Sequence, residues 1–449
     1  MQNKKNIDVV AFRSIRKASH LINKVVRKGG GFLDKVESRS TRIIVDRTGS
    51  ADARGDISVD DLIYTHLPHT LPVHPTLPNL GQKPSITVFA FLDPKGFYGG
   101  IATLLCVSAA LANKLGYDFR VAQTTGFSKN TDVLGFLASK GILVEEERFS
   151  TVDLSKRSIS NYGYLPLHPD DILVVSAWWD AQIASQLPLK NKFIYLIQDF
   201  EPIFYNNSDE YVFADQTYYS NKFLPILNTE ILYEFFKEND YTYIAENAVW
   251  FEPAPAPNVP NQVVSKAKKT TKTIFLYGRP NVHRNLFYNA VLAIDRALQD
   301  KRMQKFDWEI FSAGSGNVPD VKLHSGHTIK NKGKMDVDDY YSFALSVDIA
   351  VSPMLAPHPN YPTLEIASLG ATVVTTKWRT KQNLDRYSPN IFMADASVDS
   401  MAENIITAAL QTPSITKSNL AKTNIGNNWT EALDDPISKL ATKISNNIK

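Results

Sequence analysis

Short apolar runs alternate with stretches of helical spacing through most of the chain. The runs are rich in β-branched residues, which is typical of buried strands, whereas the stretches between them repeat apolar residues at helical intervals. The clearest runs lie at 86–92, 119–125, 192–202, 273–280, 308–316, 348–352, 371–375 and 391–395. Because alternating strands and helices form parallel sheets, the pattern predicts an α/β fold.

The proline-rich segment 251–262 interrupts this alternation and has no periodicity, so it predicts a semi-rigid linker between two domains. Each domain is expected to be Rossmann-like, with a doubly wound sheet, and the C-terminal tail has helical spacing around Trp429 and Leu433. The predicted parts are a basic extension (1–80), a first domain (81–255), a second domain (256–412) and a C-terminal helix (413–449).

The stretch 348–376 combines several signals. It predicts a strand ending in Ser-Pro, a stiff proline-rich loop, a short helix over 363–369 and another strand from Ala371. Open α/β sheets bind ligands beyond the carboxyl ends of their strands, next to helix N-termini. We therefore expect backbone amides between Tyr361 and Leu364 to meet an anion, and Glu365, in the first turn, to accept hydrogen bonds from a sugar diol.

This order of strand, Ser-Pro, loop, LEIASLG and strand resembles the signature of family 4 glycosyltransferases of the GT-B fold. The strand ending in Gly278-Arg279 also resembles a motif of that family. The resemblance implies two Rossmann-like domains facing each other across a cleft, with a C-terminal helix that returns to the first domain. It also implies that a nucleotide sugar binds in the cleft.

The resemblance assigns roles to residues that match the family's motifs. Arg279 and Lys332 are predicted to be catalytic, because their charges would stabilise the leaving diphosphate. Arg284 stands where the family has a lysine, and Arg retains the charge. The predicted donor-binding residues are Gly99, Gly100, Arg279, Arg284, Gly314, Tyr361, Pro362, Thr363, Leu364 and Glu365.

The sequence departs from the family's motifs at Arg284 and Pro357, and two simpler alternatives stay open. Pro357 stands where the family has the first of two glutamates, so Tyr361 and His358 are candidates to replace its contact with the donor sugar. The alternatives are a tight turn at the glycines and an ordinary βαβ unit with Glu365 solvated.

Polar and aromatic residues follow two strands of the first domain. Trp178, Trp179, Asp199 and Glu201 are the predicted acceptor-binding residues, because aromatic faces beside hydrogen-bonding groups suit sugar rings. Catalysis by Asp199 or Glu201 is one interpretation, and loop solvation or helix capping is the alternative.

Composition narrows the class of protein. Of the 449 residues, 43% are hydrophobic and 21% charged, which is typical of a globular protein with two or three domains. No apolar run is long enough to span a bilayer or form a signal peptide. The single cysteine, Cys106, excludes an internal disulfide and favours a buried thiol in a reducing compartment, so we expect a cytoplasmic protein.

The N-terminal extension has a strong local charge. Residues 1–48 hold twelve Lys or Arg against four Asp or Glu, an excess of +8, and residues 7–28 have helical spacing. Such a surplus fits peripheral contact with anionic lipids at the inner face of the cell membrane, with a solvated basic helix as the alternative. The net charge of +3 gives no reason to expect nucleic acid as a partner.

Metal binding is not predicted. His66, His69 and His74 have no Cys or Glu partner in their proline-rich segment. Asp336 and Asp338 open a predicted helix, where carboxylates favour the helix dipole.

The missing glutamate, the YGRPNVHRN stretch and the long extension resemble the bacterial rhamnosyltransferases that build S-layer and rhamnan glycans, most closely the β-1,2-rhamnosyltransferases of S-layer glycan assembly. That likeness implies retaining transfer of L-rhamnose from dTDP-β-L-rhamnose to a lipid-linked glycan, without a metal or other cofactor. A transferase for a UDP- or GDP-sugar and a non-catalytic subunit that binds nucleotide sugar or glycan are the alternatives.

Overall fold

The computed structural model describes residues 58–77, 81–93, 97, 99–126, 128, 131–157, 163–257, 271–316, 318–411 and 413–447. The chain divides into two compact units, Met1–Pro68 and His69–Lys449. In the first unit, helix α3 (Val59–His66) begins at Ser58, whose side chain accepts a hydrogen bond from the Asp61 amide. The basic segment 1–48 and its predicted helix lie outside the described residues.

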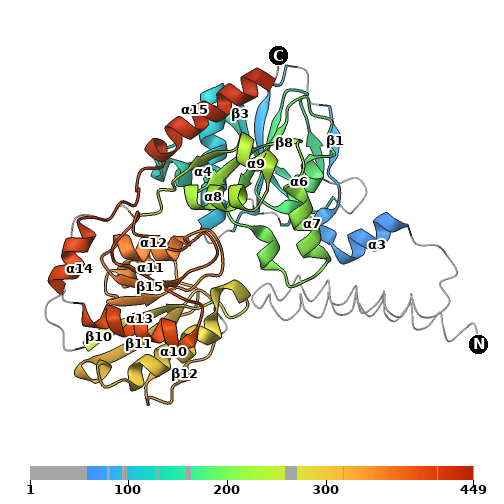
Figure 1. Ribbon diagram of the computed structural model, residues 1–449. Coiled ribbons are helices and arrows are strands. Elements are labelled where there is room, and N and C mark those ends of the chain that lie inside the picture. The colour runs from blue at the N-terminus through green and yellow to red at the C-terminus, as the bar shows by residue number, and fades with distance from the viewer. Residues whose placement is uncertain are drawn as a thin grey trace, which may run out of the picture. The chain divides into compact units, whose positions relative to one another are not determined.

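The first sheet of the second unit has seven strands, all parallel, in the order β4-β3-β2-β6-β7-β8-β9 (Figure 1). Every residue of β2, β6, β7 and β8 is buried, as expected for strands covered on both faces. The strands are β2 (Ser85–Phe89), β3 (Asp118–Gln123), β4 (Phe149–Asp153), β6 (Ile172–Val175), β7 (Phe193–Ile197), β8 (Phe223–Asn228) and β9 (Val249–Phe251).

Helices cover both faces of this sheet. One face packs against α4 and α15, and the other packs against α6, α8 and α9, giving two separate apolar clusters. Thr229 caps the N-terminus of α8, since its hydroxyl accepts from the Leu232 amide at 3.3 Å. The helices are α4 (Gly99–Leu115), α5 (Val133–Ser139), α6 (Trp178–Ala184), α7 (Asp209–Thr217), α8 (Glu230–Glu238) and α9 (Thr242–Asn247).

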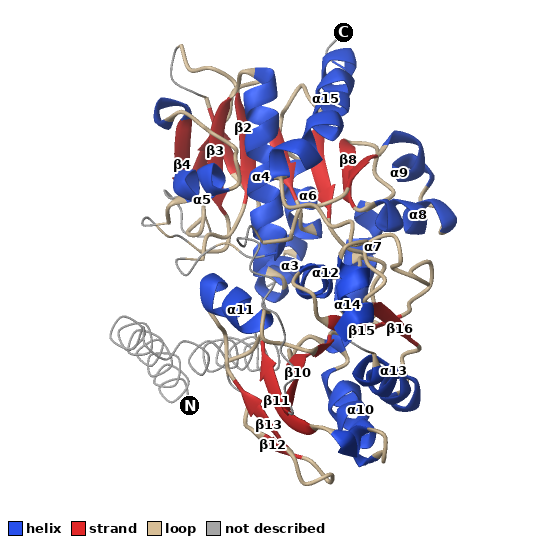
Figure 2. Cartoon of the chain, turned by 90° about the vertical axis from the view of Figure 1, so that its left-hand side faces the viewer, coloured by secondary structure: helices blue, strands red, loops and turns tan. Residues whose placement is uncertain are grey.

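The second sheet also has seven strands, in the order β12-β13-β11-β10-β14-β15-β16, and only β12 is antiparallel to its neighbour (Figure 2). Helices α10 and α13 cover one face, and α11 and α12 the other. The strands are β10 (Thr271–Tyr277), β11 (Asp307–Ala313), β12 (Val321–Lys322), β13 (Thr328–Asn331), β14 (Ile349–Val351), β15 (Thr372–Thr376) and β16 (Ile391–Ala394). The helices are α10 (Phe287–Gln299), α11 (Val337–Ala344), α12 (Tyr361–Ser368), α13 (Val398–Leu410) and α14 (Pro413–Leu420).

The last helix, α15 (Trp429–Asn447), belongs to the core of the first sheet although it ends the chain. Its buried face, Trp429, Leu433, Ile437 and Leu440, packs in the same apolar cluster as α4, beside which it lies in Figure 1. Two doubly wound parallel sheets confirm the predicted α/β fold class.

The segment after Pro68, expected in the extension, packs with the sheets instead. The Arg157 guanidinium donates hydrogen bonds to the carbonyls of His69 and Leu71 at 3.0 and 2.9 Å. Strand β1 (His74–Thr76) then pairs in parallel with β5 (Tyr164–Pro166). The reason is that Arg157, distant in sequence, provides the donors that fix this extended backbone.

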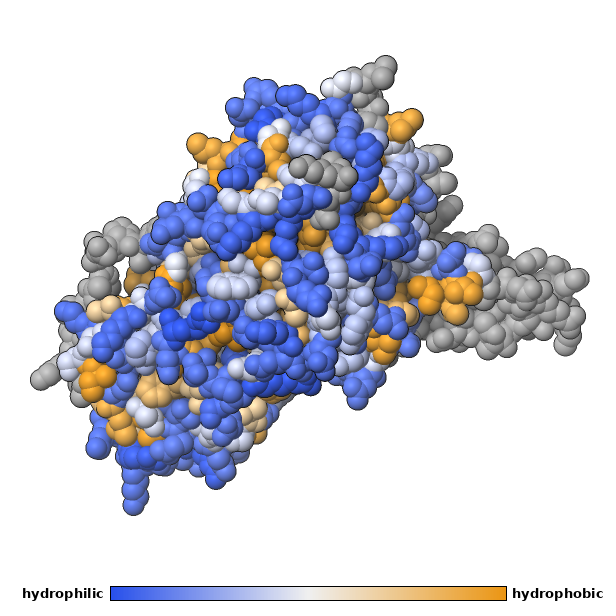
Figure 3. Space-filling view, turned by 45° about the horizontal axis from the view of Figure 1, so that its top comes forward, coloured by the Kyte–Doolittle hydropathy of each residue, from blue (hydrophilic) through white to orange (hydrophobic). Residues whose placement is uncertain are grey.

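The surface in Figure 3 is largely polar, with apolar residues scattered among polar ones. Among the described helices, none combines the length and apolar character needed to cross a membrane. Cys106 is a buried free thiol, as predicted, and burial raises its pKa to about 12.

Candidate functional site

The carboxyl edges of the two sheets meet at an ion pair. Asp199 follows β7, and its carboxylate lies 3.8 Å from Nε of Arg284, which lies between β10 and α10. The Arg284 guanidinium also lies 3.7 Å from the centre of the Phe204 ring, and the backbone carbonyl of Arg284 accepts a hydrogen bond from the Leu355 amide at 2.8 Å. The structure thus joins a predicted donor-binding cation to a predicted acceptor-binding carboxylate.

The predicted acceptor residues have different environments. Asp199 and Glu201 are buried, and burial raises the pKa of Glu201 to about 8, partly offset by a hydrogen bond from the Trp178 amide. Burial also raises the pKa of Asp199, although the charge of Arg284 opposes this. Protonated carboxyl groups at this edge could donate as well as accept hydrogen bonds.

Trp178 corrects the acceptor prediction. Its side chain is 0% exposed, and its indole N–H donates to the Tyr205 hydroxyl at 2.8 Å. It therefore has no face to offer to a sugar. Trp179 is only half-buried and packs edge-on against His69, so its predicted contact with an acceptor stays a prediction.

Arg279 and Gly314 lie together at the carboxyl ends of β10 and β11. Gly314 has φ +120°, and a Cβ there would lie 3.2 Å from Cγ of Arg279. Arg279 is half-buried and makes no ion pair with any residue that the structure describes. Its guanidinium is thus available to an anionic ligand.

Lys332 has a different position from the one expected. Its exposed ammonium lies 4.7 and 4.9 Å from the ring centres of Phe311 and Phe343, on β11 and α11. Within the described residues it makes no ion pair, and its catalytic role stays a prediction. The ammonium of the neighbouring Lys334 forms an ion pair with the Asp93 carboxylate of the first domain, at 2.9 Å.

The N-terminus of α12 offers fewer amides than predicted. The helix begins at Tyr361, after Asn360 with φ 76°, so it starts two residues earlier than the predicted 363. Pro362 has no N–H, and the Leu364 amide donates to the Asn360 carbonyl at 3.3 Å. Of the positions from Tyr361 to Leu364, only Tyr361 and Thr363 have an amide without an acceptor in the described part of the chain. Pro362 and Leu364 therefore cannot offer an amide to an anion as predicted.

The glycines of the first domain lie next to this helix. A Cβ on Gly99 would lie 3.8 Å from the Tyr361 ring, and the Gly100 carbonyl accepts from the Gln198 amide at 2.9 Å. The Tyr361 hydroxyl is bonded to Thr103 and Asn228 of the first domain, each at 2.6 Å. Tyr361 therefore bridges the domains, and this hydroxyl is not available to replace the missing glutamate.

Glu365 lies in the second turn of α12, not in the first as predicted, because the helix begins earlier. Burial raises its pKa to about 7, and the neighbouring Tyr340 hydroxyl and the Lys140 charge oppose this. Its carboxyl group could bind a diol as an acceptor or, when protonated, as a donor.

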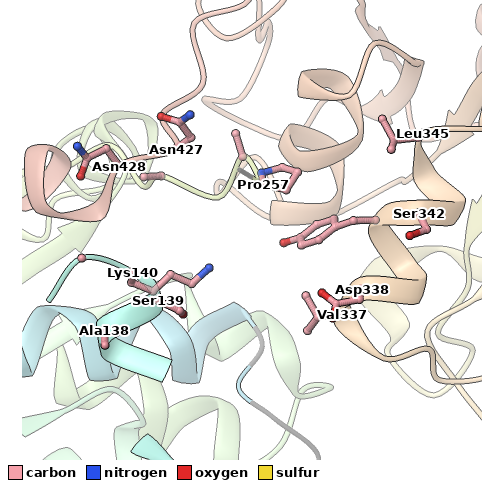
Figure 4. Close-up of a pocket in the computed structure, with 14 residues that line it drawn as sticks. Ala138, Ser139, Lys140, Pro257, Val337, Asp338, Ser342, Leu345, Asn427 and Asn428 are labelled. Carbon is pink, nitrogen blue, oxygen red and sulfur yellow. The ribbon is translucent and has the colours of Figure 1, made fainter. Parts of the chain in front are cut away.

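A cavity of about 1000 Å³ lies between α5 and α11 (Figure 4). Lys140 lies on one side, Asp338 and Ser342 on the other, and Pro257 and Asn428 mark the segments that connect the domains. The charge of Lys140, which lines the cavity, also lowers the pKa of Glu365. The volume of the cavity can hold a nucleoside.

Sequence reasoning missed Lys381. The segment after Thr376 consists mainly of polar residues, yet the Lys381 side chain is 0% exposed. Its ammonium donates to the carbonyls of Met354 and His358 at 3.0 and 3.4 Å. Burial lowers its pKa, and the Asp199 charge opposes this. No local pattern distinguishes such a lysine from a solvated one.

Several buried polar atoms at or just after the ends of strands β7, β8, β10 and β14 have no hydrogen-bond partner in the described structure, which is unusual for buried groups and leaves them able to pair with a ligand. They are Gln198 Oε1, Asn228 Oδ1, Arg284 Nε, Asn285 Oδ1, His358 Nε2 and Thr363 Oγ1. Within the described ranges, no group of three or more His, Cys, Asp or Glu residues is arranged to hold a metal ion.

Family comparisons match both sheet domains. The WsaF N-terminal domain matches residues 87–230, and the WsaF C-terminal domain matches residues 272–406. The O-antigen biosynthesis protein RfbC of Myxococcus xanthus is 28% identical over 227 residues, which are 50% of this chain and 17% of that protein. The chain therefore matches only a small part of this relative.

Solved structures share the fold at low identity. Sucrose-phosphate synthase from Thermosynechococcus elongatus has a TM-score of 0.53 and 11% identity, over 81% of this chain and 98% of its own. HepE from Anabaena, in complex with UDP and glucose, has a TM-score of 0.50 and 14% identity, over 80% and 99%. The chain therefore has the GT-B fold, and its two sheet domains match the two domains of WsaF.

Proposed function

We propose that the protein transfers L-rhamnose from dTDP-β-L-rhamnose to a hydroxyl of a growing, lipid-linked cell-surface glycan, with retention of configuration. The observation that carries the proposal is the row of unpartnered buried polar atoms along a cleft that also holds Arg279 and Arg284. The WsaF matches favour rhamnose as the sugar, and the RfbC match favours a glycan of the cell surface as the product.

Different residues of the site would perform different steps of the transfer. Arg279, Arg284 and the amides of Tyr361 and Thr363 would hold the diphosphate and stabilise its charge as the bond to the sugar breaks. The acceptor hydroxyl forms the new bond, and its proton passes to the leaving phosphate. Glu365 would bind the deoxyribose, with the base in the cavity of Figure 4. These steps require no metal or other cofactor.

A UDP-sugar is the second candidate donor. HepE, which shares the fold, was solved with UDP and glucose. The half-buried Glu365 would bind a ribose of UDP at least as well as the deoxyribose of dTDP, because only ribose has two neighbouring hydroxyls. The base and the sugar therefore need a direct test.

Thermal unfolding with dTDP, UDP, GDP and dTDP-L-rhamnose tests the proposal, because a ligand that binds the folded state raises the melting temperature. We expect dTDP and dTDP-L-rhamnose to raise it. Arg279→Ala should lose most of this rise, since it removes a predicted phosphate-binding cation that makes no ion pair within the described residues.

Lys305→Ala provides a matched control, because it removes an exposed cation of the same domain beside β11, at the far end from the site. It should respond to nucleotides as the wild type does. Stabilisation by UDP or GDP alone would mean that the donor carries that nucleotide and not dTDP. No stabilisation by any nucleotide, together with no sugar transfer, would contradict the proposal.

A further inference from the structure

His358, in the loop between β14 and α12, is held by three of its polar groups. Its ring Nδ1 accepts from the Asn360 amide at 3.0 Å, and its carbonyl accepts from the Lys381 ammonium at 3.4 Å. Its own amide interacts with Asp199 and lowers the pKa of that carboxyl group. Both the backbone and the ring of His358 are therefore fixed.

The remaining ring nitrogen is a donor without an acceptor. Because Nδ1 accepts, the neutral ring carries its proton on Nε2. His358 is only 6% exposed, and Nε2 has no partner within the described ranges. A buried donor is normally paired, so an exception at a cleft points to a ligand atom.

The ring remains neutral in the physiological pH range. Burial, together with the charges of Lys381 and Arg284, lowers its pKa to about 3. His358 is therefore a neutral donor of one hydrogen bond, not a cation that would compete with Arg279 or Arg284 for phosphate. It can donate to an uncharged oxygen atom without adding a charge to the site.

The position of the ring selects the ligand oxygen. His358 lies between Asp199, at the end of β7, and the free amides at the start of α12, and its ring packs edge-on against Tyr361 at 5.3 Å. A sugar linked to a phosphate at α12 and directed at the first domain would pass this ring. Resting on the function proposed above, we propose that Nε2 of His358 donates a hydrogen bond to an oxygen of the transferred sugar and so determines which sugar is accepted.

Two substitutions separate the two ring nitrogens. His358→Asn retains an acceptor near Nδ1 for the Asn360 amide but does not reach the position of Nε2. His358→Gln places an amide N–H near Nε2 but shifts the acceptor. Calorimetry with dTDP and with dTDP-L-rhamnose would give the dissociation constants for the wild type and both variants.

We expect all three proteins to bind dTDP within about twofold of one another. For dTDP-L-rhamnose, His358→Asn should bind about tenfold more weakly than the wild type, and His358→Gln should recover part of the loss. If the wild type prefers UDP and UDP-glucose, the same comparison is made with that pair. Thermal unfolding without ligand checks that both variants are folded.

The outcomes distinguish the two proposals. If His358→Asn binds the nucleotide sugar as tightly as the wild type, the role of His358 is overturned and the proposed function stands. Equal losses for free nucleotide and nucleotide sugar would overturn it too, since they would mean that His358 only shapes the loop. A wild-type protein that binds no nucleotide sugar would overturn the proposed function, and the role of His358 with it.

Discussion

Three acidic side chains at the carboxyl edge of the first sheet carry raised pKa values because they are buried: Asp180, Asp199 and Glu201. Burial penalises the charged form of each, and nearby Arg157 and Arg284 compensate only in part. Such groups remain where function or packing requires them, because apolar residues would stabilise the fold more. Their protonation should therefore be visible in the stability of the protein.

Glu201 gives the clearest pH dependence. Its folded pKa of about 8 exceeds its ordinary value of 4.5, so between these values the folded protein holds a proton that the unfolded chain has lost. The free energy of unfolding should therefore fall as the pH rises through this range, by about 1.4 kcal/mol per unit of pKa difference at most. Glu201→Gln removes this contribution, so its melting temperature should fall less between pH 5 and pH 8 than that of the wild type.

The exposed Glu238, on α8, provides the control. Glu238→Gln should retain the wild-type dependence of melting temperature on pH. Equal slopes for Glu201→Gln and the wild type would show that Glu201 ionises in the folded protein as it does in the unfolded chain.

At the scale of one element, α12 connects the two domains through its first residue. Tyr361→Phe removes the hydroxyl that accepts from Asn228 and pairs with Thr103. The Asn228 side-chain amide would then be left unpaired in a buried site, whereas Thr103 keeps its hydrogen bond to the Gly99 carbonyl at 3.1 Å. We therefore expect the free energy of unfolding to fall by about 1–3 kcal/mol. Urea unfolding measures this loss.

Tyr288→Phe is the matched control for Tyr361→Phe, because Tyr288 is 69% exposed and its hydroxyl faces solvent. It should unfold at the wild-type urea concentration. Equal midpoints for the two variants would mean that the Tyr361 bridge adds nothing to stability.

The elements themselves were largely predictable, because they depend on local patterns. Strand β10 followed by Gly278 and Arg279, the helix near 363–369 and the returning tail helix all appear where apolar periodicity placed them. The start of α12 was missed by two residues because the unusual φ of Asn360, not a capping side chain, begins the helix.

The environments of single side chains were not predictable, because they depend on residues distant in sequence. Trp178 is buried against Tyr205 and Phe213, and Lys381 is buried against the loop at Met354. A window of sequence shows an aromatic pair and a polar loop in these places. Only the packing of separate strands shows which side chains face the cleft.

At the scale of the whole second unit, the buried apolar cores of the two sheets are separate clusters. Where the sheets meet, polar contacts lie beside a few apolar ones, such as Trp378 against Phe235. These polar contacts include the pair of Arg386 with Glu230 and the hydrogen bond from Tyr387 to Glu252 at 2.7 Å. Exposed ion pairs stabilise little, so the two domains should open independently.

Leu440 in α15 tests this independence, because it is 0% exposed in the core of the first sheet although it lies near the chain's end. Leu440→Ala should lower the stability of the first domain by about 2–5 kcal/mol through the cavity it leaves. Hydrogen exchange should then speed up at the amides of β2 and β3 and stay unchanged at those of β10 and β11. Lys439→Ala, on the exposed side of α15, should change neither set. Equal acceleration in both sheets would instead mean that the polar contacts of the cleft couple the domains into one cooperative unit, and ligand binding at the cleft would then stabilise the whole of it.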